Sequence, residues 1–285
     1  MKAILVAVDL SQHSACLLAR AAQLANHGKA VVTVLHVREN LSYEEEILRG
    51  AVEKQVRATL EASIAAAGFD NPPALLVEDG VPHRVITETT RELSADVIVI
   101  GPGQPASVAE YMFGSTADRV VRTAPAPILI VRNETAQPYR YAAVAIDFSP
   151  FSQAALDATR TLAPAAERVL VHACEIPLQF EQAMLKVGTP ATEVERYRQS
   201  RLAKSRSQLV KFARRYGSRE KTLLLRGMPA EALIDLSRDD QVDLIALGSQ
   251  GLNAVTQALI GSVAMRLLAQ AGCDLLVVGA ASATQ

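Results

Sequence analysis

The 285-residue sequence lacks several features that would assign it to a class at once. It has only three cysteines and no Cys-x-x-Cys pair, so neither a disulfide framework nor a zinc site is expected. We interpret Cys16, Cys174 and Cys273 as packing residues. The longest apolar runs, such as "ADVIVIG", are far shorter than the ~20 residues that a membrane span needs. We therefore expect a soluble, cytoplasmic protein with no membrane partner.

The chain also lacks an excess of charge of either sign. It has 29 basic and 30 acidic residues, so no global field draws it to nucleic acid, which is not an expected partner. One segment departs from this balance, because residues 196–221 contain ten basic residues and one acidic residue. Leu202, Leu209 and Phe212 recur there at helical spacing, which favours the solvated face of a packed helix over a patch that binds polyanions.

The sequence contains an internal repeat. "AILVAVDLS" at 3–11 returns as "AAVAIDFSP" at 142–150, which aligns Asp9 with Asp147. Residues 78–101 align in the same way with residues 225–248, and about nine extra residues have entered the second repeat, which we place within 175–220. The polar segment 133–141, "NETAQPYRY", separates the copies. It predicts one domain over residues 1–136 and another over residues 137–285.

Each repeat alternates β-branched runs with segments of helical period, which is typical of a parallel sheet covered by helices. We expect the first helix to have Ser11 as its N-cap and Gly28 as its stop, and the third helix to begin at Pro82 or Pro229. The prediction is an α/β fold with two tandem, doubly wound, Rossmann-like domains, each a five-stranded parallel sheet flanked by helices. The strands predicted for the first repeat are 3–9, 30–37, 74–79, 95–100 and 127–132.

The stretch "GSQGLNAVTQALIGS" at 248–262 joins the end of a predicted strand to the start of a helix. A glycine turn before a helix offers unpaired backbone N–H groups and the positive end of the helix dipole, which suits phosphate. The alternative is that the glycines only turn corners. Asp9 and Asp147 end the first strands, where ligands bind in parallel sheets. Their alternative role is to cap the next helix, although Ser11 and Ser149 are also able to do so.

Three elements now occur twice in the same order: the strand-ending aspartate, the histidine elements at 35–37 and 171–173, and the glycine motif. Together they resemble the universal stress protein family in its tandem two-domain form. The resemblance implies an adenine nucleotide alpha hydrolase-like fold and, for members with the motif, bound ATP, with Mg²⁺ held by the phosphates and not by protein ligands. It implies a nucleotide site in the second repeat formed by Asp147, Ala173, Leu247, Gly248, Gln250, Gly251, Gly261, Ser262 and Val263.

The first repeat departs from the motif. Gln104 stands where the second repeat has Gly251, and Pro102 and Pro105 each remove a backbone N–H, while Glu110 adds a negative charge. A hydrogen bond to a charged group contributes about 1.5–3 kcal/mol, so the loss of one or two weakens binding about tenfold to several thousandfold. We expect this repeat to bind ATP poorly or differently. Its weaker candidate set is Asp9, Val37, Gly101, Gly103, Gly114 and Ser115.

The second glycine loop favours binding over turnover. It contains no Lys, Arg, Asp or Glu from 248 to 262, the P-loop pattern is absent, and the nearest cation of the motif is Arg266. We therefore assign no catalytic residue and expect an ATP-binding, nucleotide-responsive stress protein. Two alternatives stay open: a slow ATPase or nucleotidyl-transfer enzyme, and a nucleotide-free interaction module. His36 and His172 have no carboxylate nearby in sequence, so we expect neither a metal nor a catalytic role for them.

The last strand of each repeat, "PILIVR" or "DLLVVG", is a candidate sheet edge. The resemblance implies that such edges form homodimers, and in a tandem chain they can instead pair within one molecule as a pseudo-dimer. Asp274 is an unexpected acidic residue at the start of the second of these strands. It leaves the position of that edge open.

Overall fold

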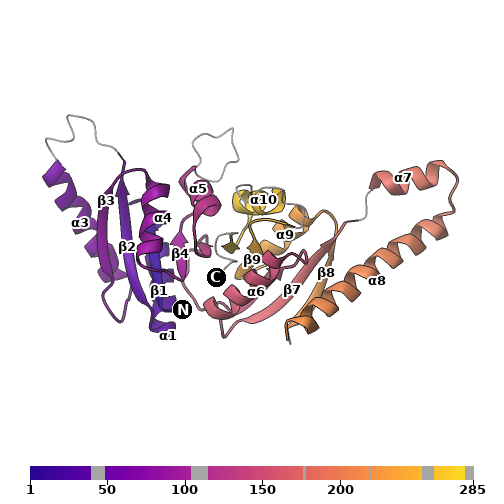
Figure 1. Cartoon of the computed structure of the whole chain (residues 1–285), viewed down its shortest axis with the longest axis horizontal. Coiled ribbons are helices and arrows are strands. Elements are labelled where there is room, and N and C mark those ends of the chain that lie inside the picture. The colour runs from indigo at the N-terminus through magenta and orange to yellow at the C-terminus, as the bar shows by residue number, and fades with distance from the viewer. Residues whose placement is uncertain (40–48, 104–114, 176–177, 218–219, 252–259, 280–285) are drawn as a thin grey trace.

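The structure is a computed structural model that describes residues 1–39, 49–103, 115–175, 178–217, 220–251 and 260–279. Both repeats fold as alternating strands and helices (Figure 1). The first repeat contains β1 (Ala3–Val8), α1 (Ser14–Gly28), β2 (Val31–Arg38), α3 (Arg49–Ala66), β3 (Ala74–Asp79), α4 (Pro82–Glu92), β4 (Val97–Ile100), α5 (Ser115–Thr123) and β5 (Ile128–Ile130). The second contains β6 (Tyr141–Ala145), α6 (Pro150–Leu162), β7 (Glu167–Cys174), α7 (Leu178–Lys186), α8 (Ala191–Arg215), β8 (Lys221–Arg226), α9 (Pro229–Ser237), β9 (Leu244–Gly248), α10 (Ser262–Gln270) and β10 (Asp274–Val278).

The predicted parallel sheets are confirmed. The first repeat has the strand order β3-β2-β1-β4-β5 and the second has β8-β7-β6-β9-β10, with parallel pairing throughout each half. The strand order reverses between β1 and β4 in the first repeat and between β6 and β9 in the second. This reversal defines the doubly wound topology. In the first repeat every observed strand begins and ends within two residues of its predicted range.

The two halves join into one ten-stranded sheet. The last strands β5 and β10 pair antiparallel, with Leu129 opposite Leu276. Of the two arrangements expected for these edges, the pairing within one chain is the one observed. The pairing uses the exposed sides of β5 and β10, so the outer edges of the continuous sheet are β3 and β8.

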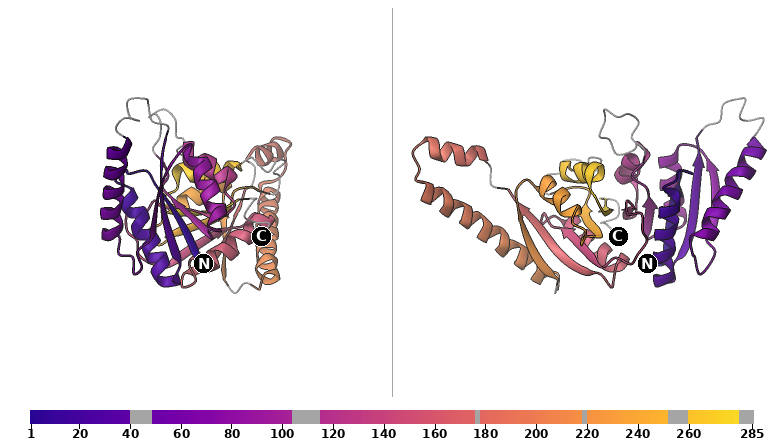
Figure 2. Two further views of the ribbon diagram at one scale, coloured as in Figure 1. Left: turned by 60° about the vertical axis from the view of Figure 1, so that its left-hand side comes forward. Right: turned by 180° about the vertical axis from the view of Figure 1, so that it is seen from behind.

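Helices cover both faces of this sheet, as the two views of Figure 2 show. One apolar cluster lies under α1, α3, α6 and α8, and it runs from Val6 through Leu129 and Leu276 to Val144. The opposite cluster lies under α4, α5, α9 and α10. Each cluster contains residues of both repeats, so the apolar core continues across the junction of the two halves.

The start of α1 differs from the prediction, whereas the start of α6 agrees with the cap proposed for it. Ser11 is not the N-cap of α1, because the helix begins only at Ser14; the Ser11 backbone N–H and the Ser14 hydroxyl both donate to Asp9 Oδ1. Gly28 is the last helical residue, and the left-handed cap is Lys29, with φ 52°. In contrast, Ser149 caps α6 by accepting a hydrogen bond from the Ser152 backbone N–H.

Two further predictions are confirmed by the element bounds. Pro82 and Pro229 are the first residues of α4 and α9. The extra residues of the second repeat lie between β7 and β8, which are separated by residues 175–220, whereas β2 and β3 are separated only by residues 39–73. In Figure 1, α7 and the first part of α8 extend outward from the body of the second repeat as an arm.

Asp274 is buried at the junction of the halves, where its carboxylate links the linker to β10 by hydrogen bonds. Its Oδ1 accepts hydrogen bonds from the backbone N–H groups of Arg132 and Asn133, at 2.7 and 2.8 Å. Its Oδ2 accepts the Tyr139 hydroxyl at 2.6 Å and lies 3.3 Å from Arg20 Nε. Arg20 belongs to α1, so one carboxylate ties the first repeat, the linker and the second repeat together. Because both charged groups are buried, each depends on the other for compensation.

Candidate functional site

Asp147 follows β6 and organises the turn into α6. Its Oδ1 accepts hydrogen bonds from the Ser149 backbone N–H at 3.0 Å, from the Ser149 hydroxyl at 2.6 Å and from the Ser152 hydroxyl. The Ser152 hydroxyl also accepts the Asp147 backbone N–H at 2.9 Å. These bonds fix the carboxylate through one oxygen, so Oδ2 is left to face the glycine loop.

The three motif glycines of the second repeat face different neighbours. A Cβ on Gly248 would lie 2.4 Å from the Phe151 Cβ, so this glycine is required by helix packing. A Cβ on Gly251 would lie 3.0 Å from Asp147 Oδ2, so this glycine lets the loop approach the carboxylate. A Cβ on Gly261 would make only ordinary contacts, the nearest at 3.5 Å. The fold itself therefore has no steric need for glycine at 261.

His172 lies beside the same strand end. Its Nδ1 is 2.7 Å from the carbonyl oxygen of Ile146, and since a carbonyl only accepts, Nδ1 carries the proton and donates. The ring contacts Phe148, with centroids 4.6 Å apart. Phe148 has φ 67°, and the matching Leu10 has φ 63°, both in the left-handed region that non-glycine residues rarely adopt. This backbone conformation places the aromatic ring next to the candidate site.

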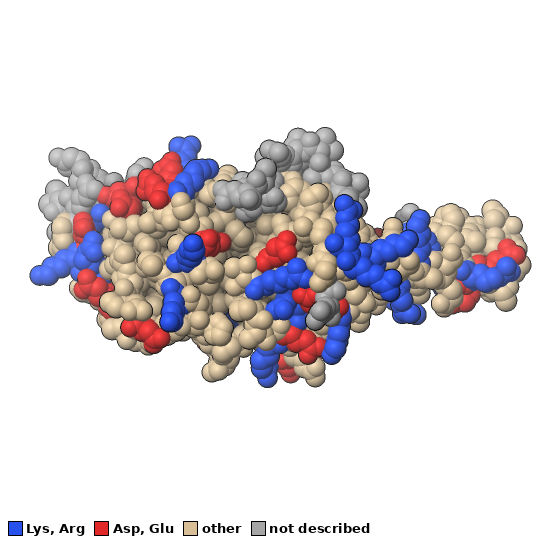
Figure 3. Space-filling view, turned by 60° about the horizontal axis from the view of Figure 1, so that its bottom comes forward, with Lys and Arg blue, Asp and Glu red and all other residues tan. Residues whose placement is uncertain are grey.

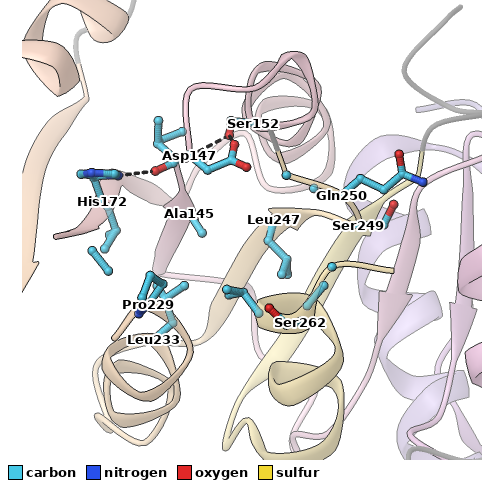
Figure 4. Close-up of a pocket in the computed structure, with 18 of the residues that line it drawn as sticks. Ala145, Asp147, Ser152, His172, Pro229, Leu233, Leu247, Ser249, Gln250 and Ser262 are labelled. Carbon is cyan, nitrogen blue, oxygen red and sulfur yellow. Dashed lines mark hydrogen bonds between the residues drawn. The ribbon is translucent and has the colours of Figure 1, made fainter. Parts of the chain in front are cut away.

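These elements surround a cavity of about 590 Å³ in the second repeat. In Figure 4, Asp147 and His172 lie on one side of the cavity, with Pro229 and Leu233 below them and Leu247 and Ser262 across from Asp147. Every residue predicted for the nucleotide site of this repeat lines the cavity: Asp147, Ala173, Leu247, Gly248, Gln250, Gly251, Gly261, Ser262 and Val263. The remaining loop residues, 252–259, lie outside the described residues.

Several lining residues were not predicted from the sequence. The polar ones are Ser152, His172 and Ser249, and apolar walls come from Ala145, Ile146, Val171, Pro229, Leu233, Ile260 and Ala264. The sequence contains a weak signal for the first two of these polar residues. Ser152 follows Asp147 by five residues, as Ser14 follows Asp9, and His172 occupies the repeated histidine position next to Ala173.

The charge of the cavity comes from a single side chain among the residues that the structure shows lining it. Asp147 is that residue, and no Lys or Arg is among them. Arg266, the nearest cation of the motif, is paired with Glu231 at 2.9 Å on the neighbouring helix α9. The cavity therefore offers phosphate only backbone N–H groups and hydroxyls within its described part.

The first repeat has a corresponding cavity of about 770 Å³. Asp9, Val37, Gly101 and Gly103 of the weaker candidate set line it, together with Pro102. Gly114 lies outside the described residues, as do Gln104, Pro105 and Glu110, and Ser115 begins α5 although its side chain is outside the described part.

The carboxylate of Asp9 is held in its charged form. Burial raises its pKa, but hydrogen bonds from Ser11 and Ser14 outweigh that effect and lower the pKa overall. Glu39 also lines this cavity. Among the described lining residues the two charged side chains are therefore both acidic, which is unfavourable for phosphate groups.

The three cysteines are free, with Cys174 and Cys273 buried and Cys16 half-buried. No group of three or more His, Cys, Asp or Glu side chains among the described residues is arranged to hold a metal ion. In the same part of the chain, no helix combines the length and apolar composition that crossing a membrane requires.

The chain is a tandem pair of parallel α/β domains. Each domain has a cavity at the carboxyl ends of its strands, beside an aspartate and a glycine turn, which is typical of doubly wound α/β proteins. The family model described as "Universal stress protein family" matches residues 1–132 and again residues 138–279. The chain therefore belongs to the universal stress protein family, as a tandem member.

Individual relatives agree with this assignment. A putative universal stress protein of Staphylococcus haemolyticus is 26% identical over 150 residues, which span 47% of this chain and 86% of that protein. A universal stress protein of Thermus aquaticus is 42% identical over 60 residues, which span 21% of this chain and 44% of that protein. The crystal structure of a universal stress protein from Archaeoglobus fulgidus has a TM-score of 0.69 at 20% identity and covers 97% of this chain and 98% of that one. That likeness shows the shared fold.

Proposed function

We propose that the protein binds ATP in the cavity of its second repeat and acts as a nucleotide-responsive regulatory protein of the stress response. The main supporting observation is that Asp147 Oδ2 lies at the cavity beside Gly251, while Oδ1 is already held by Ser149 and Ser152. An anchored carboxylate whose second oxygen accepts no hydrogen bond from the described residues suits the hydroxyl groups of a ribose. The cavity volume of about 590 Å³ is in the range of small-molecule sites.

Each part of the nucleotide has suitable partners in this proposal. Ser262 and the first turn of α10 offer backbone N–H groups, a hydroxyl and the positive end of a helix dipole to the phosphates, while the Gly261 N–H is already donated to the Ser249 carbonyl oxygen at 2.8 Å. The apolar side chains of Pro229 and Leu233 offer contacts to the adenine ring. Because none of the described lining residues adds a second carboxylate, a Mg²⁺ ion would be held by the phosphates.

Binding is a better interpretation than turnover. Phosphoryl transfer requires positive groups on the transferring phosphate and a residue that positions the nucleophile. The Arg266 guanidinium is engaged by Glu231, and no other cation is among the described residues of the cavity. We therefore propose that bound ATP changes an interaction surface and is not a fuel for chemistry.

The two repeats are proposed to be unequal. The cavity of the second repeat is lined by Gly251 and the first turn of α10, whereas that of the first repeat has Pro102, which lacks a backbone N–H, and an additional carboxylate from Glu39. Both differences weaken the binding of phosphate in the first repeat. The expected stoichiometry is one tightly bound ATP per chain.

Calorimetric titration of the full chain with ATP tests the proposal, with Gly261→Ala as the main variant. Because a Cβ at 261 meets only ordinary contacts in the protein, this variant is expected to keep its melting temperature and lose at least tenfold in ATP affinity. Gly28→Ala is the matched control, since Gly28 lies at the end of α1 with a nearest contact at 3.9 Å. Its affinity for ATP is expected to stay at the wild-type value.

Two results would contradict the proposal. One is a wild-type chain that takes up no ATP at millimolar concentration and carries no adenine nucleotide when purified, as measured by mass spectrometry. The other is steady-state ATP hydrolysis that disappears in Gly261→Ala, which would favour the enzyme.

A further inference from the structure

Helix α8 concentrates positive charge in a way that the fold does not require. Residues 196–221 have ten basic residues and one acidic residue, while the whole chain has a net charge of −1, so the rest of the chain has a net charge of −10. The first repeat provides an internal comparison. Its helix α3 holds the same place between the second and third strands, yet it has three basic and two acidic residues, whereas α8 has eight basic and two acidic residues. The charge of α8 is thus a property of this helix and not of its position in the fold.

Most of these cations lie on one side of α8. At 3.6 residues per turn, six of the eight cations of α8 fall within an arc of about 140°, and five of these six lack the ion pair that Arg196 forms with Glu193. The buried side chains of Leu202, Leu209 and Phe212 fall outside that arc, on the side that packs against the sheet. We call the five the cationic stripe; they are Arg201, Lys204, Lys211, Arg214 and Arg215.

The cations of the stripe are exposed and not neutralised by the protein. All five side chains are exposed, and none forms an ion pair with a described residue. Arg215 contacts only the ring of Tyr216, at 5.7 Å. In Figure 3, Lys and Arg side chains gather over the stretch of the molecule that contains α8, with few acidic side chains among them. Repulsion between unpaired cations on adjacent turns is a cost that a bound polyanion would remove.

The chemistry of the stripe favours one kind of polyanion. From Arg201 to Arg215 the helix rises about 21 Å, enough to follow several phosphates of a duplex. Recognition of single strands usually includes exposed aromatic rings among the cations, but Tyr216 packs on Phe212, and the exposed ring of Phe180 lies on Tyr197, one turn before the stripe begins. Insertion into a membrane surface requires exposed apolar side chains beside the cations. Helix α8 has no large one, and the exposed Leu185 and Val187 lie at the end of α7 and after it, before α8 begins.

We propose that the cationic stripe of α8 binds the phosphate backbone of a nucleic-acid duplex without reading its sequence. The contacts are charge-assisted hydrogen bonds from Arg and Lys to phosphate oxygens, and they require no base contact. This inference does not depend on the nucleotide site, because the stripe lies on a different helix from every residue that lines the cavity.

Fluorescence anisotropy of a labelled 20-base-pair DNA or RNA duplex, titrated with the full chain at several KCl concentrations, tests the inference. Five phosphate contacts predict a slope of log K against log[salt] of about −4.5, so binding at 200 mM is expected to be about 500-fold weaker than at 50 mM. The variant Lys204→Gln/Lys211→Gln/Arg215→Gln is expected to reduce the slope to about −1.8. Its fold is checked by circular dichroism and is expected to be unchanged, because the three side chains are exposed.

Arg206→Gln is the matched control, because Arg206 is an exposed cation of the same helix that lies about 150° away from the centre of the stripe. It is expected to keep the wild-type slope. Three outcomes would overturn the inference: no duplex binding at 50 mM KCl, an equal loss in Arg206→Gln and the triple variant, or salt-sensitive binding to phosphatidylserine vesicles without binding to either duplex. The last outcome would assign the stripe to a membrane surface.

Discussion

The buried carboxylate of Asp274 illustrates how much one residue does in this molecule. It compensates the charge of Arg20, accepts the Tyr139 hydroxyl and fixes two backbone N–H groups of the linker. Burial, together with the Asp274 charge, raises the pKa of Tyr139 well above its usual value, so the phenol stays neutral and donates. Tyr139 therefore remains the donor of its hydrogen bond to Asp274.

Asp274→Ala is expected to destabilise the chain by about 3–5 kcal/mol, because it leaves a buried guanidinium without its counter-charge. The double variant Arg20→Met/Asp274→Leu is expected to recover part of that loss, since it removes both charges and keeps apolar volume. Urea denaturation followed by circular dichroism measures both. A double variant less stable than Asp274→Ala would show that the ion pair is not the main reason for the loss.

Cys273 is expected to be chemically inert in the folded protein. Burial, with a further contribution from the Asp274 charge, raises the pKa of its thiol to about 12. At pH 8 only about one molecule in ten thousand carries the reactive thiolate. Titration with a thiol reagent is expected to leave Cys273 unmodified in the native chain and to count three thiols after denaturation. Reaction of all three thiols in the native state would contradict the burial of Cys273.

The same pKa has a consequence for stability at alkaline pH. The folded thiol holds its proton to a higher pH than the unfolded thiol, whose pKa is near 9.0. The unfolded state thus loses its proton first, and this group makes the free energy of unfolding fall as the pH rises from about 9 toward 12. Below pH 9 the group has no such effect.

At the scale of elements, regular structure was predictable wherever local sequence decides it. The strands follow from short β-branched runs, and the starts of α4 and α9 follow from Pro82 and Pro229. The late start of α1 at Ser14 was not predicted. The Ser11 N–H donates to Asp9 just as the Ser149 N–H donates to Asp147, but only Ser149 is followed by a proline at the first helical position.

The residues of the candidate site were likewise predictable only in part. The resemblance to the universal stress protein family, which rests partly on the glycine spacing and the strand-end Asp147, implied nine residues that do line one cavity. His172 was missed as a member of the site because its placement depends on the pairing of β6 with β7 and on its contact with Phe148, whose non-glycine backbone is left-handed. Whether these residues bind nucleotide stays a prediction.

The two repeats allow a direct test of helix capping. Ser149→Ala removes the cap of α6 and one of the hydroxyl bonds to Asp147, so a loss of about 0.5–2 kcal/mol is expected. Ser11→Ala changes the equivalent residue of the first repeat, which caps no helix, and a smaller loss is expected. Thermal melts of the two variants provide the comparison. Equal losses would mean that Ser149 stabilises the turn and not the helix.

At the scale of the whole molecule, the continuous sheet predicts cooperative unfolding. Because both apolar clusters contain residues of both repeats, neither half is expected to keep its core when the other unfolds. Differential scanning calorimetry is expected to show one transition, with equal calorimetric and van't Hoff enthalpies. ATP at a hundred times its Kd is expected to stabilise that single transition by about 2.7 kcal/mol. Two separate transitions, with only one shifted by ATP, would contradict the coupling of the halves.

The antiparallel pairing of β5 with β10 also has an evolutionary consequence. In a symmetric homodimer one gene encodes both sites, so any substitution appears in both copies at once. Here the facing strands belong to one polypeptide, and each cavity is encoded by its own codons. Gln104 and Gly251 were therefore free to diverge while the shared sheet remained intact, which allows one molecule to keep an inherited ligand at one site and acquire a different specificity at the other.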